Sequence, residues 1–149
     1  MKATLSFCGG AGSVTGANFL LEGENSKLIV DCGLLQGERF AASANREPFS
    51  FDPASISHLV VTHAHIDHIG RIPQLVRAGF KGRIVSTPAT RDLAALMFLD
   101  ALAVMRGEGK EAALYDEEDI TAARALWDTL SYHEKKSVGE FEILFLDSG

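Results

Sequence analysis

The feature that most constrains how this chain can fold is an apolar run that ends in a cluster of metal-ligand side chains. Residues 59–61 read Leu-Val-Val, which is typical of a buried strand, and residues 62–68 read Thr-His-Ala-His-Ile-Asp-His. Side chains alternate faces along an extended chain, so His63 and His65 should point the same way. The sequence therefore predicts a strand whose end carries ligands for a metal ion.

The second half of this segment should supply a second set of ligands. We expect the chain to turn at Ile66, so that Asp67 and His68 reach the far side of a common centre. His63 and His65 would then ligate one ion, while Asp67 and His68 ligate another beside it. Imidazole nitrogen and carboxylate oxygen are ligands that Zn²⁺ takes in catalytic sites. Iron(II) or manganese would accept the same ligands, because ligand type alone does not select one metal.

Three other interpretations of the segment fit less well. The histidines could be hydrogen-bonded surface groups, but four ligand-type side chains at this density would then be a coincidence. A structural zinc would normally close its coordination with cysteine, and no cysteine lies nearby in the sequence. A helical zinc-protease motif places its histidines at i and i+4, whereas His63 and His65 are at i and i+2. A metal-hydrolase site is the best interpretation.

The pattern His-x-His-x-Asp-His after an apolar strand resembles the metal-binding signature of the metallo-β-lactamase superfamily. Three other segments are similar to its β-CASP branch, which contains RNA-processing nucleases. They are the glycine loop 9–18 (Gly-Gly-Ala-Gly-Ser-Val-Thr-Gly-Ala-Asn), residues 31–33 (Asp-Cys-Gly) followed by Gln36-Gly37, and residues 46–53. The resemblance covers essentially all 149 residues.

The resemblance implies an α/β fold, namely the first half of an αββα sandwich in which a mixed sheet carries helices on its outer face. Residues 147–149, Asp-Ser-Gly, resemble the start of the family's third motif, in which a metal-binding histidine follows at once. We therefore expect residues 1–149 to form the N-terminal part of a metallo-β-lactamase domain, truncated before the third metal motif.

The resemblance also implies a function for the complete domain. It would be a zinc-dependent ribonuclease that cleaves RNA phosphodiesters with water activated by two zinc ions. Asp67 would orient that water or receive its proton. Asp31 would accept hydrogen bonds that orient metal-ligating histidines, or it would simply cap a turn. Because several of the family's ligands are absent, we expect the 149 residues alone to be inactive.

Two alternatives to the ribonuclease remain open. A hydrolase of thioesters or lactones would share the fold, although the glycine loop 9–18 favours the nuclease. A non-catalytic half-domain that binds a partner chain would instead use the strand edge and apolar surface left open at Gly149. A homodimer is also considered as an assembly of the full-length protein.

The composition is that of an ordinary soluble domain, with 46% hydrophobic and 23% charged residues. The net charge of −6, from 14 basic and 20 acidic residues, counts against nucleic acid as a substrate, because phosphate binding draws on Lys and Arg. No apolar run approaches the roughly 20 residues that a membrane span needs, and the start lacks a signal-peptide pattern. We expect a cytoplasmic protein without membrane contact, in which Cys8 and Cys32 stay reduced.

Strands and helices should alternate along the chain. Strands are expected at 3–7, 18–21, 27–30, 57–62, 83–86, 131–135 and 141–146, and helices at 69–78, 90–106 and 116–130. Residues 36–55 should be loop with one helical turn, because they are polar and contain two prolines. The acidic cluster 115–119 should open the last helix, since negative side chains are favoured in a first helical turn.

Four further residue patterns have plain structural interpretations. The glycine loop has GxGxxxG spacing and leads into a strand, so it should be a tight connection and not a dinucleotide site. His58 and His133 should be surface or packed histidines outside the site. Thr62 should be an ordinary strand-end residue, with a local role on the metal loop as the alternative.

Overall fold

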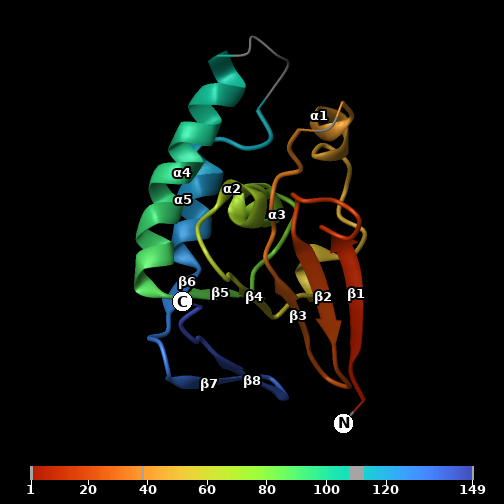
Figure 1. Ribbon diagram of the computed structural model, residues 1–149, viewed down its shortest axis with the longest axis vertical. Coiled ribbons are helices and arrows are strands. Elements are labelled where there is room, and N and C mark those ends of the chain that lie inside the picture. The colour runs from red at the N-terminus through yellow and green to blue at the C-terminus, as the bar shows by residue number, and fades with distance from the viewer. Residues whose placement is uncertain (1, 38, 108–112, 149) are drawn as a thin grey trace.

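The computed structural model describes residues 2–37, 39–107 and 113–148 (Figure 1). The strands are β1 (Thr4–Gly9), β2 (Asn18–Glu22), β3 (Lys27–Val30), β4 (His58–Val60), β5 (Arg83–Ser86), β6 (Trp127–Thr129), β7 (Lys135–Val138) and β8 (Phe141–Leu144). The helices are α1 (Ala41–Ala44), α2 (Ile66–Ile69), α3 (Ile72–Arg77), α4 (Pro88–Gly107) and α5 (Glu117–Ala125), and a 3-10 turn covers Pro53–Ser55.

The main sheet contains β1 to β6 in sequence order. β1, β2 and β3 are antiparallel neighbours, whereas β3, β4, β5 and β6 run parallel. β1 therefore ends at the same edge of the sheet as the parallel strands. The glycine loop after β1, the loop after β3 and the histidine segment after β4 all leave from that edge. The predicted α/β fold with a mixed sheet is confirmed.

The two faces of the sheet are covered differently. Ile29 and Leu59 are fully buried in the larger core, which also contains buried residues of α2, α3, α4 and α5. Leu28 and Val60 lie one position away and point to the other face, where they pack against Val138 of the β7–β8 hairpin. Figure 1 shows the helices beside the sheet and the hairpin below it. The predicted helical layer on one face of the sheet is therefore present.

The helix predicted at 116–130 is wrong in its second half. Its start is confirmed, because Asp116 and Asp119 form a reciprocal capping box at the beginning of α5. The helix ends at Ala125, however, and Trp127 begins β6, which pairs with β5. The Trp127 indole donates a hydrogen bond to the buried Ser86 hydroxyl at 2.8 Å. Pairing with the sheet and burial of this ring outweigh the helical pattern.

Two other predicted elements also differ in the structure. The strand expected at 131–135 begins only at Lys135, because His133 takes a left-handed backbone conformation with a φ of 65°. The helix expected at 69–78 corresponds to α3, which covers only Ile72–Arg77, and the separate short helix α2 precedes it where a turn was expected. Pro73 lies in the first turn of α3, where its missing N–H costs nothing and favours a new helix start. The helical turn expected within 36–55 corresponds to α1.

Among the described helices, none combines the length and the apolar character needed to cross a lipid bilayer.

Replacing Phe98 by Ala should strongly destabilise the fold. Phe98 of α4 is 0% exposed and contacts the rings of Tyr115 and Trp127 at centroid distances of 6.5 and 6.2 Å. The cavity left behind should lower the free energy of unfolding by about 3–5 kcal/mol. Urea unfolding followed by circular dichroism measures this change.

The matched control is Leu96→Ala on the same helix, because Leu96 is 66% exposed. This substitution should change the free energy of unfolding by less than about 0.5 kcal/mol. Equal effects of the two substitutions would contradict the assignment of the core.

Candidate metal centre

The candidate site is built where β3 and β4 end. Asp31 follows β3 and takes the left-handed backbone region, with a φ of 59°. Aspartate tolerates this region because its short side chain can bond locally. The Asp31 N–H donates to the Val60 carbonyl, and Asp31 Oδ1 accepts from the Thr62 N–H at 2.8 Å. The carboxylate therefore continues the bonding between the two strands beyond the point where the ladder stops.

The short helix α2 is held in place by backbone bonds from two loops. A helix of four residues is not stable by itself. The Asp67 carbonyl accepts from Ala17 N–H at 2.9 Å, and the His68 carbonyl accepts from Cys32 N–H at 2.7 Å. Gly33 lies so close to this turn that a Cβ there would overlap the Asp67 carbonyl. The loops after β1 and β3 thus determine where the ligand-type side chains of α2 point.

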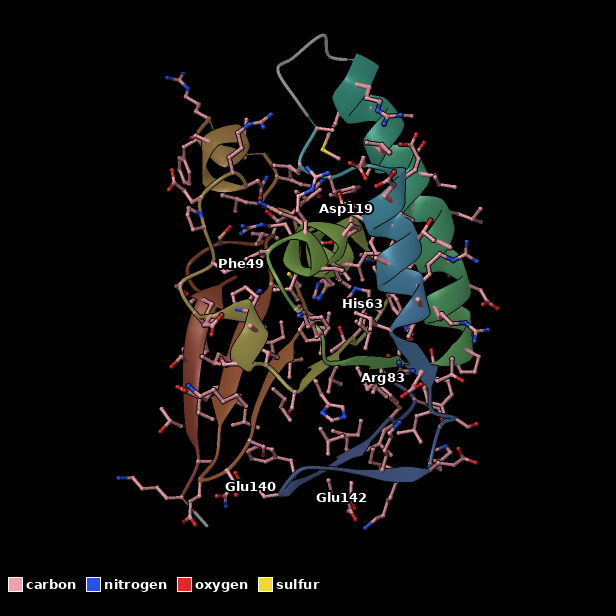
Figure 2. The ribbon with its side chains drawn as sticks, turned by 180° about the vertical axis from the view of Figure 1, so that it is seen from behind. Phe49, His63, Arg83, Asp119, Glu140 and Glu142 are labelled. Atoms are coloured by element: carbon pink, nitrogen blue, oxygen red, sulfur yellow. The ribbon has the colours of Figure 1, made fainter. Side chains whose placement is uncertain are left out.

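The four ligand-type side chains form two adjoining pairs. His63 Nε2 and His65 Nδ1 lie 3.1 Å apart, and His68 Nε2 and Asp67 Oδ2 lie 3.6 Å apart. Two ligands on one tetrahedral ion, each bonded at about 2.1 Å, would stand about 3.4 Å apart. The rings of His63 and His68 are 4.0 Å apart between centroids, so the pairs are neighbours. The structure brings these four residues together, and which of them would share an ion stays a prediction. Figure 2 labels His63 near the middle of the molecule.

Asp31 connects this cluster to the sheet. Its side chain is 2% exposed, and its Oδ2 lies 2.8 Å from both Thr62 Oγ1 and His68 Nδ1. A buried carboxylate is costly unless it is hydrogen-bonded, and here both oxygens are. The contact with His68 agrees with the role predicted for Asp31. The other oxygen accepts from the Thr62 N–H at the end of the neighbouring strand, which joins two strands and is not a turn cap.

The environment of His63 favours its neutral form. Burial lowers the pKa of His63 below its ordinary value, and the neighbouring His68 and His65 lower it further. Asp31 and Asp67 oppose this shift to a smaller extent. A metal ion binds neutral imidazole, so the environment keeps His63 in the form that can ligate.

The described residues provide two pairs of metal-ligand donor types. Each pair provides two donors, and within residues 2–37, 39–107 and 113–148 no group of three or more His, Cys, Asp or Glu side chains is arranged to hold an ion. The donor types fit zinc, which takes imidazole and carboxylate ligands. A catalytic zinc usually has three protein ligands, so each position would need at least one more donor.

Both cysteines are free thiols, as predicted. Cys32 is completely buried beside Asp31, and burial raises the pKa of its thiol to about 12. The thiolate is the form that binds metals and attacks electrophiles. Cys32 therefore contributes packing beneath the site.

Sequence reasoning missed the contribution of Arg71. Its N–H donates to the Cys32 carbonyl at 2.9 Å. Its guanidinium donates to Gln74 Oε1 and to the Glu47 carbonyl, both at 2.9 Å, and lies 4.3 Å from the centre of the Phe49 ring. Arg71 thereby fixes the loop after β3 against α3. No local pattern could have shown this, because the partners come from separate segments.

The two remaining histidines lie outside the cluster, as predicted. His58 is half-buried at the start of β4, where its Nδ1 lies 3.2 Å from Ser57 Oγ. His133 is exposed, and its Nε2 lies 2.9 Å from Asp147 Oδ2. Asp147 belongs to the predicted Asp-x-Gly motif, whose last residue, Gly149, lies outside the described residues.

A mixed sheet covered by helices, with His-x-His-x-Asp-His after a parallel strand, defines the class of metallo-β-lactamase-like proteins. Residues 12–138 match the metallo-beta-lactamase superfamily, and the chain belongs to that superfamily.

Solved structures agree in fold. The metallo-beta-lactamase fold protein YhfI from Bacillus subtilis has a TM-score of 0.55 and 16% identity, over 97% of this chain and 53% of YhfI. A metallo-beta-lactamase from Cronobacter sakazakii has a TM-score of 0.54 and 18% identity, over 93% of this chain and 51% of its own.

Several relatives of the chain are named as ribonucleases or RNA-processing factors. Ribonuclease TTHA0252 of Thermus thermophilus is 36% identical over 141 residues, which is 95% of this chain and 31% of the relative. Transcription termination factor FttA of Methanosarcina mazei is 37% identical, over 95% of this chain and 22% of the factor. Cleavage and polyadenylation specificity factor 73 of Drosophila melanogaster is 30% identical, over 87% of this chain and 19% of the factor. These relatives belong to the β-CASP branch, and the chain spans a third or less of their length.

Replacing Gly33 by Ala should disturb the site and the fold together. The new Cβ would overlap the Asp67 carbonyl, so the loop after β3 or the turn α2 must shift. We expect the free energy of unfolding to fall by about 2–3 kcal/mol. Thermal unfolding and the ring proton resonances of His65 and His68 would report both effects.

Gly107→Ala is the matched control, because a Cβ at Gly107 would meet nothing within 4 Å. The free energy of unfolding of the Gly107→Ala variant should equal or slightly exceed that of the original chain, since alanine favours helix more than glycine does. If Gly33→Ala proved as harmless as Gly107→Ala, the close packing of loop and helix would be disproved.

Proposed function

We propose that this chain is part of a metal-dependent hydrolase, most specifically a zinc-dependent ribonuclease. The observation that carries the proposal is that two pairs of donors, His63 with His65 and Asp67 with His68, lie at the carboxyl ends of the parallel strands. Membership of the metallo-beta-lactamase superfamily supports a hydrolase. Relatives named as ribonucleases support RNA as the substrate.

In this proposal, His63 Nε2 and His65 Nδ1 would hold one zinc ion, and Asp67 Oδ2 and His68 Nε2 would hold the second. Bound zinc would lower the pKa of a water molecule and polarise a phosphoryl oxygen. Burial lowers the pKa of His63, which favours its neutral form, and the paired donors lie close together. The missing donors would come from the part of the relatives' length that this chain does not span.

In this proposal, Asp67 would also act on the attacking water. Its backbone is fixed by Ala17 and packed against Gly33, while its side chain remains partly open to solvent. A carboxylate placed beside the attacking water can orient it and accept its proton. Asp31 is too buried for that task, because it is 2% exposed and both its oxygens are engaged. We therefore assign Asp31 to holding His68 and not to contact with substrate.

The RNA part of the proposal depends on the relatives and not on charge. The chain carries 14 basic and 20 acidic residues, which disfavours a phosphate-binding surface on these residues alone. The two ions would add positive charge where the phosphate binds. A basic RNA-binding surface would have to lie in the remainder of the full-length protein. The homodimer and the cytoplasmic location stay predictions.

Zinc should bind to this chain at two separable positions. After removal of metals, zinc titration followed by isothermal calorimetry should show two weakly held ions per chain. His63→Ala and Asp67→Ala should each lose one of them, because each removes a donor from a different pair. His133→Ala is the matched control and should keep both, because His133 pairs with Asp147 elsewhere. If the original chain bound only one zinc ion, and both His63→Ala and Asp67→Ala abolished its binding, the arrangement with two positions would be contradicted.

The full-length protein should cut single-stranded RNA in a metal-dependent manner. Chelation should abolish cleavage and zinc should restore it, while Asp67→Asn should lower the rate by about 10²–10⁴-fold. A labelled single-stranded RNA resolved on a denaturing gel measures the rate. The 149 residues alone should be inactive in the same assay. A full-length, metal-loaded protein that leaves RNA intact but hydrolyses a thioester or lactone would overturn the ribonuclease proposal in favour of the alternative hydrolase.

A further inference from the structure

We infer that the Thr62 hydroxyl is a positioning group that sets the tautomer of His63 and thereby aims its Nε2 lone pair at the first metal position. The role rests on the proposed zinc site, because it concerns how a ligand is prepared. It makes Thr62 more than a strand-end residue. Its basis is the chain of hydrogen bonds from Asp31 through Thr62 to His63.

The single proton of the Thr62 hydroxyl is committed to Asp31. Thr62 Oγ1 lies 2.8 Å from Asp31 Oδ2, and a carboxylate only accepts, so the hydroxyl donates in that direction. His63 Nδ1 lies 3.0 Å from the same hydroxyl oxygen. The hydroxyl has no second proton, so it can only accept from His63. His63 therefore carries its proton on Nδ1, and its Nε2 is left with a free lone pair.

The same carboxylate oxygen sets His68 without an intermediary. Asp31 Oδ2 lies 2.8 Å from His68 Nδ1 and accepts its N–H. In the neutral ring this leaves the lone pair on His68 Nε2, which lies 3.6 Å from Asp67 Oδ2. Asp31 thus fixes His68 directly and His63 through Thr62. One buried carboxylate prepares one imidazole for each of the two metal positions.

The described side-chain contact of His65 differs from those of His63 and His68. Its described side-chain contact is with His63, whose Nε2 lies 3.1 Å from His65 Nδ1. With Nε2 of His63 unprotonated, His65 Nδ1 can donate to it before any metal binds, and ligation through His65 Nδ1 would require that proton to move to Nε2. The geometry of the pair is therefore consistent with the tautomer assigned to His63.

The hydroxyl, and not the bulk of the side chain, carries this role. Thr62 is exposed, so its methyl group adds little to the core. Valine has nearly the same shape and lacks the hydroxyl, while serine keeps the hydroxyl and lacks the methyl. Thr62→Val and Thr62→Ser therefore separate the hydrogen bond from the shape.

The test uses metal-free protein at a pH where the histidines are neutral. Long-range ¹⁵N–¹H correlation spectra of the imidazole rings identify the protonated nitrogen. The original chain and Thr62→Ser should show His63 protonated on Nδ1. Thr62→Val should shift His63 towards the Nε2-protonated form that free histidine favours, while His68 keeps its proton on Nδ1 through Asp31. Far-ultraviolet circular dichroism of all three proteins should be the same.

Zinc titration of the same three proteins gives a second readout. Thr62→Val should weaken zinc affinity about 10-fold at one position, as is usual when the partner of a ligating histidine is lost. This is the position at which His63→Ala abolishes zinc binding. Thr62→Ser should bind like the original chain. An unchanged His63 tautomer in Thr62→Val would overturn the inference, whatever zinc does. A shifted tautomer in a protein that never binds zinc would support the role of Thr62 and overturn the proposed metal site instead.

Discussion

The hydrogen-bonded carboxylate of Asp31 is the interaction on which the rest of this site depends. It lies where two parallel strands end, at 2% exposure, and bonds the Thr62 backbone, the Thr62 hydroxyl and the His68 ring. Removing one partner from a buried charged network typically costs about 3–5 kcal/mol. The same contacts join the sheet to the histidine segment. Stability of the fold and orientation of the candidate ligands therefore have a common origin in this corner of the structure.

The sheet topology explains why this corner can form from segments far apart in sequence. Because β1 ends at the same edge as the parallel strands, the glycine loop meets the loop after β3 and the turn α2. Backbone bonds from Ala17 and Cys32 to the carbonyls of α2 need a close approach, which Gly33 permits by lacking a Cβ. Gly33 thus allows the main chain of one loop to pack directly against the main chain of α2. The effect is to present four ligand-type side chains as two ready pairs.

Much of the fold and of the candidate site follows from local sequence patterns, and the exceptions have physical causes. The apolar run at 59–61, the capping acids of α5 and the apolar periodicity of α4 each predict their element. The end of α5 could not be foreseen, because it depends on Trp127 reaching Ser86 across the sheet. The pairing of His63 with His65 and of Asp67 with His68 follows from strand alternation and a turn. The contributions of Arg71 and of the Thr62 hydroxyl do not, since they depend on Glu47 and Asp31, which only the tertiary structure brings to them.

The most direct test of the account is anomalous diffraction at the zinc edge from crystals of the chain grown with zinc. Two anomalous peaks should appear at the carboxyl ends of the parallel strands. One should lie between His63 Nε2 and His65 Nδ1, and the other between Asp67 Oδ2 and His68 Nε2. Asp31 should lie outside both coordination spheres and keep its hydrogen bond to His68. A single peak bound by Asp31, or zinc only on surface residues away from this edge, would contradict the account.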